Sequence, residues 1–574
     1  MKRVLTVFAS VLLLCVLGAC DGGEKTSTDE QQSLNEQPSA ANPLPEVATK
    51  NNVKPDYGGR IVIGTIGEPT NLISALSNDS ASKEITSQLY IGLLKYDKDL
   101  EIVPWAAESY DVEEGGTLLR FRLRKGIQWE DGTELTADDV EFTYRMMIDP
   151  KTPTAYASDF LAVKEFRKID KYTVEVRYEK PFARSLITWM SDILPKHKLE
   201  GQDLVTTPLL RKPVGSGPYK LKEWVPGSRV VLEANDSYFE GRPYIDEVVY
   251  RNIPDLATMF LELKAGKLDM MGLTPQQFKF QSNGGEWDAN WQKFRYLSFG
   301  YAYLGYNLER APFNELNVRR ALSYGIDRKA LIAGVLLGEG RTTVGPYKPE
   351  TWVYNDKLDE YPYDIAEARR LLAQAGFTDS DGNGVVERDG QPFVFTILTN
   401  QGNDQRIKAA TIIQSQLKQV GVDVRIRTVE WAAFVKEFVE KGRFDAVLLG
   451  WNILQDPDIF MVWHSSQAVA GGLNFTKYRN PEVDSLLEQA RSVLDQESRK
   501  PLYDEVQRIL DYEQPYSFLY VPYALPIVHA RFKGVEPAPA GLTHNFTKWW
   551  VPAGMQRYKA ASGRAASNDE TKKN

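Results

Sequence analysis

Both cysteines of this chain lie within its first twenty residues, at positions 15 and 20. The rest of the 574 residues must therefore fold without a disulfide bond. Their stability has to come from apolar cores, and the length is ample for two or three domains. Aromatic residues make up 11% of the chain, with 12 Trp and 28 Tyr. Because Trp and Tyr combine a broad apolar face with a polar tip, some of them are available to line a pocket.

The N-terminus carries an export pattern. Lys2 and Arg3 precede an apolar run over 4–16, and Leu-Gly-Ala-Cys follows at 17–20. Cations, a short apolar run and small residues before a cleavage point are typical of a secretory signal. The run is too short to span a bilayer, which takes roughly 20 residues. We therefore predict a signal peptide over 1–19.

The four residues 17–20 resemble the lipobox of bacterial lipoproteins, in which the cysteine thiol receives a diacylglycerol. The alternative is an ordinary secretory signal with a chance cysteine. Because the residue types and their spacing match this motif, we predict that Cys20 carries acyl chains such as palmitate. Several such chains together anchor a protein stably. The protein would then be tethered to the membrane on its periplasmic or extracytoplasmic face.

Charge and composition limit the possible partners of the protein and indicate which segments are unfolded. The formal net charge of −8 and the lack of a basic stripe exclude nucleic acid as a partner. Residues 20–56 are rich in Ser, Thr, Gln, Asn and Pro, which predicts a flexible tether behind the lipidated cysteine. The end of the chain, 557–574, has a similar composition and is predicted to be disordered.

The body between these ends mixes strands and helices. Over 118–124, apolar residues alternate with arginines, which is the period of a half-buried strand. Thr136 begins a capping box with Asp139, which predicts the start of a helix. Further on, a helical stripe over 407–420 precedes strand-like residues 422–427, a predicted helix over 431–441 and an apolar strand over 444–449. This alternation indicates an α/β fold.

Several blocks in this body resemble, in order, the bacterial extracellular solute-binding proteins of family 5, the peptide- and nickel-type receptors of ABC importers. The blocks are Gly-Glu-Pro-Thr-Asn-Leu at 67–72, the segment 118–140 with its Leu-Thr-Ala-Asp-Asp-Val, Pro-Val-Gly-Ser-Gly-Pro-Tyr at 213–219, residues 319–328, and Phe-Asp leading to Gly-Trp at 444–451. The resemblance covers roughly residues 57–555.

The resemblance implies a periplasmic-binding-protein-like type II clamshell, in which two lobes close on a ligand and one lobe carries an extra subdomain. The chain would leave and re-enter the first lobe, and two crossovers near 298 and 521 would act as the hinge. The implied division is a first lobe of 57–95, 213–298 and 522–556, an inserted subdomain of 96–212, and a second lobe of 299–521.

The same resemblance implies capture of oligopeptides and their delivery to the permease of an ABC importer. The chain lacks the Gly-x-x-x-x-Gly-Lys-Ser/Thr phosphate loop, so the ATPase would be a separate subunit. No nucleophile–base set is visible, so we expect a binding protein rather than an enzyme. We also expect it to be a monomer and to carry no cofactor. Two alternatives stay open: a sensory receptor of the same fold, and a binder of a non-peptide solute such as a nickel complex, haem or a sugar.

The resemblance also suggests residues that contact the ligand. Glu68 would bond a peptide N–H or amine, or else is a turn carboxylate beside Pro69. Trp451 and Asn452 would pass alongside the ligand backbone, although a core Trp is the alternative. Tyr523 stands near the last crossover, where relatives place an aromatic residue facing the ligand.

One departure from the family pattern concerns the ligand's ammonium group. Peptide-binding relatives carry an Asp three residues after the Trp of Gly-Trp, whereas this chain has Leu454 there. Asp456 or Asp458 is close enough to replace it. The alternatives for Asp456 are a loop turn set by Pro457, or a contact at the hinge.

Metal sites are weakly indicated. Asp379 to Gly384 resembles the first half of an EF-hand loop, but Gly390 stands where the loop needs a bidentate Glu. A tight Asp/Gly turn is therefore the preferred interpretation. The four histidines do not pair at metal-ligand spacing, and we predict no bound metal.

Overall fold

The computed structural model describes residues 54–452 and 456–557. The predicted signal peptide, Cys20 and nearly all of the tether and tail lie outside the described residues. Within the described part, no helix is both long and apolar enough to cross a membrane.

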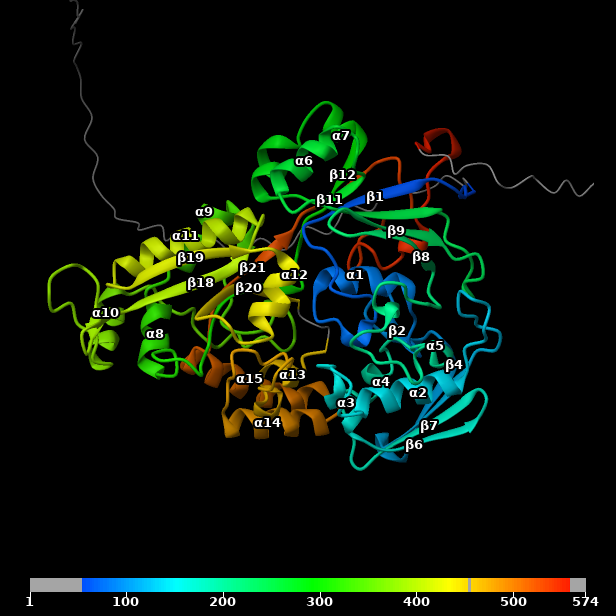
Figure 1. Cartoon of the computed structure of the whole chain (residues 1–574), viewed down its shortest axis with the longest axis horizontal. Helices are drawn as coiled ribbons and strands as arrows, with labels where there is room; N and C mark the ends of the chain where they lie inside the picture. Colours follow the sequence, from blue (N-terminus) through cyan, green and yellow to red (C-terminus); the bar gives the residue numbers. More distant parts are fainter. Residues whose placement is uncertain (1–53, 453–455, 558–574) are drawn as a thin grey trace, which may run out of the picture. The chain divides into compact units, whose positions relative to one another are not determined.

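A first seven-stranded sheet is assembled from distant parts of the chain (Figure 1). Its strand order is β12-β22-β11-β1-β10-β9-β8, and β1 runs parallel to both of its neighbours. The bounds are β1 Arg60–Thr65, β8 Tyr219–Val225, β9 Arg229–Ala234, β10 Glu247–Asn252, β11 Met270–Gly272, β12 Trp291–Lys293 and β22 Pro526–His529.

Each face of this sheet packs on a different helix. Ile61 and Ile63 of β1 face a core that includes α1 (Ser80–Leu89), whereas Val62 faces α6 (Leu256–Lys264). This is the period of two expected of a strand that is buried on both faces. A short helix, α7 (Glu286–Asn290), precedes β12.

The Gly-Ser-Gly segment packs against the end of α1. The N–H of Gly217 donates to the carbonyl of Leu89 at 2.8 Å. A Cβ at Gly215 would lie only 2.0 Å from that same carbonyl oxygen. Glycine is required here because two backbones touch, and α1 is thereby held with its N-terminus at the site described below.

A four-stranded antiparallel sheet, β4-β5-β7-β6, belongs to the segment predicted as the insertion. In β5, Leu119, Phe121 and Leu123 are buried, so the predicted alternation is confirmed. The predicted capping box at the start of α2 is also confirmed. The elements of this region are β2 Leu94–Tyr96, β3 Ile102–Pro104, β4 Ala107–Glu113, β5 Leu118–Leu123, α2 Ala137–Ile148, α3 Ala157–Leu161, β6 Val163–Asp170, β7 Thr173–Tyr178, α4 Ser185–Thr188 and α5 Lys196–Leu199.

A second seven-stranded sheet has the order β13-β21-β14-β20-β18-β19, with β15 paired to β21. The parallel strands β18 and β19 are joined by α11, whose buried Ala410, Ile413 and Leu417 confirm the predicted helical stripe. The bounds are β13 Tyr296–Leu297, β14 Gly300–Tyr306, β15 Gly340–Arg341, β18 Val394–Asn400, α11 Asp404–Lys418, β19 Asp423–Val429, β20 Ala446–Asn452 and β21 Tyr516–Ala524.

Further helices surround this sheet (Figure 1). The helix predicted over 431–441 is confirmed over 431–439, where α12 (Trp431–Ala433) continues as a π-helical segment, η5 (Phe434–Val439). The remaining elements are α8 Leu316–Tyr324, α9 Arg328–Leu336, α10 Ile365–Gln374, α13 Phe460–Trp463, α14 Pro481–Ser492, α15 Gln496–Glu513 and the small hairpin β16 Glu387–Arg388 with β17 Gln391–Pro392.

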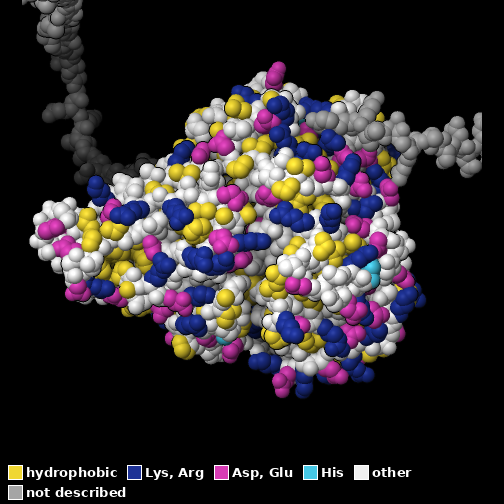
Figure 2. All heavy atoms as spheres, in the orientation of Figure 1, with side chains coloured by type: hydrophobic (Ala, Val, Ile, Leu, Met, Phe, Trp, Pro, Cys, Tyr) yellow, Lys and Arg dark blue, Asp and Glu magenta, His cyan; other side chains and the backbone are white. Residues whose placement is uncertain are grey.

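The chain passes between the two large sheets twice, from β12 to β13 and from β21 to β22. The first connection bonds to the start of β22, directly after the second connection, since the N–H of Phe294 donates to the carbonyl of Pro526 at 3.0 Å. That these connections act as a hinge, with the lobe boundaries given above, stays a prediction. On the face seen in Figure 2, basic and acidic side chains are interspersed rather than gathered by sign.

Candidate functional site

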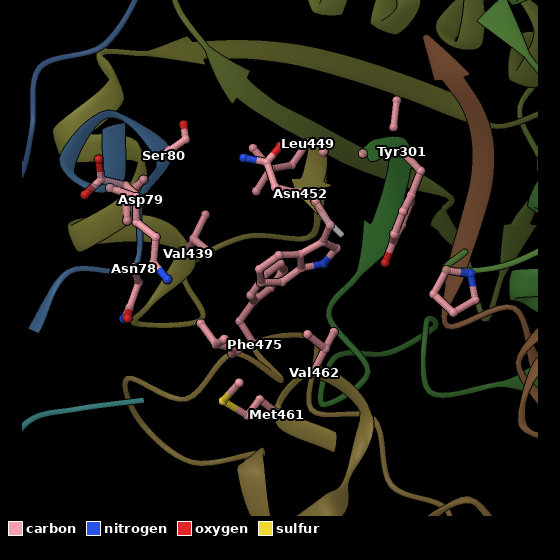
Figure 3. Close-up of a pocket in the computed structure, with 18 of the residues that line it drawn as sticks. Asn78, Asp79, Ser80, Tyr301, Val439, Leu449, Asn452, Met461, Val462 and Phe475 are labelled. Atoms are coloured by element: carbon pink, nitrogen blue, oxygen red, sulfur yellow. The ribbon is translucent and has the colours of Figure 1, made fainter. Parts of the chain in front are cut away.

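A cavity of about 740 Å³ lies between the N-terminal end of α1 and the second sheet. Its volume falls within the ~300–1,000 Å³ typical of ligand sites. In Figure 3, Asn78, Asp79 and Ser80 lie on one side of the cavity and Tyr301 on the other, with Phe475, Met461 and Val462 along a third wall. Tyr156 of the inserted region also lines it.

Aromatic side chains form much of the wall. Trp451, at the end of β20, lines the cavity, stacks on Phe475 at 5.7 Å and donates from Nε1 to the Tyr516 hydroxyl at 3.3 Å. Trp451 is thus packed on the core with one part facing the cavity, so the two interpretations offered for it are compatible. Asn452 lines the same cavity and is exposed. That both residues bind ligand stays a prediction.

One backbone edge of β20 is open beside the cavity. The ladder with β14 continues to Asn452, whereas the ladder with β18 covers only Ala446 and Val447. Residues 449–452 line the cavity, and no strand of the described part of the chain pairs with their second edge. Alternate residues of a strand direct their N–H and C=O groups to each edge, so this segment offers unused hydrogen-bonding groups.

Arg406 is the cation that sequence reasoning missed. It lies in the first turns of α11, lines the cavity and donates from Nη1 to the side-chain oxygen of Asn400 at 2.7 Å. No Asp or Glu of the described residues pairs with it. Burial lowers the pKa of this guanidinium, which nevertheless stays charged at neutral pH. The two residues just before Gly450 are leucines and offer no cation at that end of β20.

Buried polar atoms without partners surround the same cavity. Within the described part of the chain, the Nε1 atoms of Trp431 and Trp463 have no hydrogen-bond partner. Trp431 and Trp463 line the cavity. A buried polar group without a partner is costly, so these indole donors are poised for acceptor atoms of a ligand or of water.

Asp456 and Asp458 line the cavity but are also ion-paired. Asp456 lies 3.3 Å from Arg184 and 3.1 Å from Arg499, and its side chain is 8% exposed. Burial alone would raise the pKa of Asp458, but Arg491 and Arg184 hold it below its usual value. The recognition of a ligand ammonium by Asp456 that was predicted from the sequence is not tested by these contacts. Leu454 lies outside the described residues.

Glu68 and Tyr523 lie away from the large cavity. The Glu68 carboxylate accepts hydrogen bonds from Trp224 Nε1 at 3.0 Å and from the N–H of Gly227 at 2.8 Å. Tyr523 packs under the guanidinium of Arg295, 3.7 Å from the ring centre. Both residues thus have partners within the protein, and the cavity lining includes neither. Their predicted contacts with ligand are not tested by this arrangement.

The one acidic cluster with ligand-like spacing in the described residues consists of Asp379, Asp381 and Glu387, whose oxygens lie within 4.8 Å of one another. The Asp379 carboxylate accepts from the N–H groups of Gly382 and Gly384 at 2.8 and 3.0 Å. These bonds are those of the tight Asp/Gly turn preferred from the sequence.

Comparison with known proteins assigns the family. The model of the bacterial extracellular solute-binding proteins, family 5, matches residues 101–472. The oligopeptide-binding protein AppA of Bacillus subtilis is 34% identical over 560 residues, covering 96% of this chain and 99% of AppA. The heme-binding protein A of Haemophilus influenzae is 28% identical, covering 94% of this chain and 97% of that protein.

Solved structures agree. AppA of Bacillus subtilis in complex with a nonapeptide superposes with a TM-score of 0.83 at 35% identity, covering 87% of this chain and all of that one. NikZ of Campylobacter jejuni in complex with Ni(L-His) gives 0.77 at 28% identity, covering 86% and 99%. The predicted α/β clamshell is thereby confirmed, and these relatives are binding proteins rather than enzymes. This chain belongs to family 5 of the bacterial extracellular solute-binding proteins.

Proposed function

We propose that this protein is the substrate-binding lipoprotein of an ABC importer, and that it captures oligopeptides in the cavity beside β20. Lobe closure around the peptide would shift the population to a closed form, which the membrane permease recognises while a separate ATPase drives transport. The observation that carries the proposal is the open backbone edge over 449–452 on the wall of a 740 Å³ cavity. AppA, a relative at 34% identity, is an oligopeptide-binding protein.

An open strand edge suits a peptide because main-chain hydrogen bonds give affinity without reading sequence. The aromatic walls formed by Trp451, Phe475 and Tyr301 can then accommodate varied side chains through apolar contact. Bridging waters would adapt the remaining space to different residues. The arrangement therefore favours a receptor of broad sequence range.

Arg406 supports a ligand with a free carboxylate. Its guanidinium has a single described side-chain partner, the neutral Asn400, so most of its donors are unused. A charge-assisted hydrogen bond to a carboxylate is worth about 1.5–3 kcal/mol. Peptides with a free C-terminus would satisfy this cation, whereas amidated peptides would not.

The proposal is tested in two steps. Mass spectrometry of material that copurifies with the protein should show peptides, and a bound nickel complex, haem or sugar would overturn the peptide assignment without affecting the family. Calorimetry with one nonapeptide, as free acid and as C-terminal amide, should then favour the acid by roughly 10–100-fold.

A matched pair of variants locates the carboxylate site. Arg406→Gln should abolish the preference for the free acid. Lys408→Gln, an exposed cation two residues further along α11, should leave the preference unchanged. An acid preference that survives in Arg406→Gln would place the carboxylate elsewhere.

A further inference from the structure

A buried cluster of six charged side chains joins the inserted region to the helices beside the second sheet. Every member is at most 9% exposed. Two members come from the inserted region, at α3 and just before α4, and four come from the loop after β20, from α14 and from α15. They are Asp159 and Arg184 on the first side, and Asp456, Asp458, Arg491 and Arg499 on the second.

Each side of the cluster is neutral by itself. On the inserted side, Asp159 lies 2.8 Å from Arg184. On the other side, Asp458 lies 2.7 Å from Arg491 and Asp456 lies 3.1 Å from Arg499. Every carboxylate thus has a guanidinium partner on its own side.

Three further ion pairs cross between the two sides. Arg184 reaches Asp456 and Asp458, both at 3.3 Å, and Arg491 reaches Asp159 at 2.6 Å. A backbone bond accompanies them, since the N–H of Ala183 donates to the carbonyl of Arg491 at 2.7 Å. The cluster is therefore one connected network while the two sides touch.

We propose that these six side chains form a charge-balanced latch between the inserted region and the second lobe. Leaving a buried charge without a partner is strongly unfavourable. Because each side keeps its own pairs, separation breaks the crossing contacts without leaving a bare ion, and the interface can open and shut repeatedly. Asp456 and Asp458 also line the cavity, so a ligand bound there would change how readily the latch opens. Only this coupling to ligand rests on the proposed function.

The latch predicts that two destabilising substitutions of opposite charge compensate each other. Loss of packing alone would make their effects add. Asp159→Asn removes one negative charge and leaves three arginines with two aspartates. The shut state then buries a net positive charge that opening would expose to water, which disfavours the shut state. Arg491→Gln leaves two arginines facing three aspartates, with a similar result. The double variant restores two of each, so the second substitution should reverse the effect of the first.

Hydrogen exchange at the segment around Ala183 measures the interface without any ligand. We expect this amide to be protected in the unmodified protein and to exchange about tenfold faster in Asp159→Asn and in Arg491→Gln. The double variant should return to within about threefold of the original rate. Asp111→Asn is the matched control, because its pair with Arg122 lies in the same region but is 43% exposed.

Dissociation of a fluorescent nonapeptide gives the second readout, with about tenfold faster release in each single variant and recovery in the double variant. An unprotected Ala183 amide in the unmodified protein, or single effects that add in the double variant, would overturn the latch. The melting temperature of each variant identifies any general unfolding. If one single variant fails to fold, the comparison of the double variant with the other single variant still tests the latch. If no peptide binds at all, the proposed function fails while the exchange rates still judge the latch.

Discussion

Asp269→Asn should cost the first sheet about 3 kcal/mol, near the lower end of the ~3–5 kcal/mol for breaking a buried ion pair. Asp269 and Arg531 lie 2.6 Å apart and are 2% and 3% exposed. The carboxylate also accepts the N–H of Val62 at 3.0 Å, so it ties together three segments that are far apart in the sequence. An asparagine oxygen can keep the bond to Val62, but Arg531 would remain as a buried cation.

The expected loss of stability arises because Arg531 is left buried without a counter-ion, and not because the ion pair itself is highly favourable. Burial raises the pKa of Asp269 even though Arg531 opposes the rise, so desolvation offsets much of the attraction. The carbonyls of Arg60 and Met555, at 3.2 and 3.4 Å, still accept from Arg531 and keep the cost near the lower end. A neutral double variant, Asp269→Asn with Arg531→Gln, should accordingly recover much of the loss.

Urea unfolding followed by circular dichroism measures these differences through the midpoint and slope. Asp111→Asn, which breaks the exposed pair with Arg122, should cost only about 0–1 kcal/mol. The reasoning is refuted if Asp269→Asn matches this control, or if the neutral double variant is less stable than Asp269→Asn alone.

Three other expectations concern pH, backbone contact and anchoring. Burial raises the pKa of Glu130 to about 7, whereas the carboxyl of the unfolded chain has a pKa near 4.5. Between these pH values the folded protein holds a proton that the unfolded chain has released, so the free energy of unfolding falls as the pH rises. Glu130→Gln should therefore add about 1–3 kcal/mol in urea melts at pH 8 and nothing at pH 4. Gly215→Ala places a Cβ 2.0 Å from the Leu89 carbonyl and should lower the melting temperature severely, whereas Gly554→Ala meets nothing within 4 Å and should not. Cys20→Ser should move the protein from the membrane fraction to the soluble fraction, and unchanged fractionation would refute lipid anchoring.

Local patterns predicted local structure well. The capping box at Thr136 and the stripe of α11 are set by residues within a few positions of one another, so their geometry follows from helix periodicity alone. The helix after Trp431 was predicted over nearly the right residues, but its change to a π-helical turn is not encoded in the spacing of apolar residues. Such turns are rare and occur mostly as single turns within α-helices.

The site was harder to predict because its electrostatics join distant residues. Arg184 is 272 positions from Asp456, and no sequence pattern marks them as partners. Glu68 was singled out within its motif, yet its partner Trp224 is 156 positions away. Arg406 was missed because a cation near the start of a helix is ordinary, and its significance arises from the lack of any acidic partner in the described fold.

Charge balance also yields an expectation about Asp456 itself. The latch holds three arginines and three aspartates, so a ligand ammonium beside Asp456 would add a fourth positive charge near Arg184 and Arg499, at 3.3 and 3.1 Å from the carboxylate. We therefore expect acetylation of a peptide's N-terminus to change its affinity equally in the unmodified protein and in Asp456→Asn. Calorimetry with the free and acetylated forms of one peptide measures this difference. A preference for the free amine that disappears in Asp456→Asn would instead establish Asp456 as the ammonium anchor, and would require the ligand to displace an arginine from the latch.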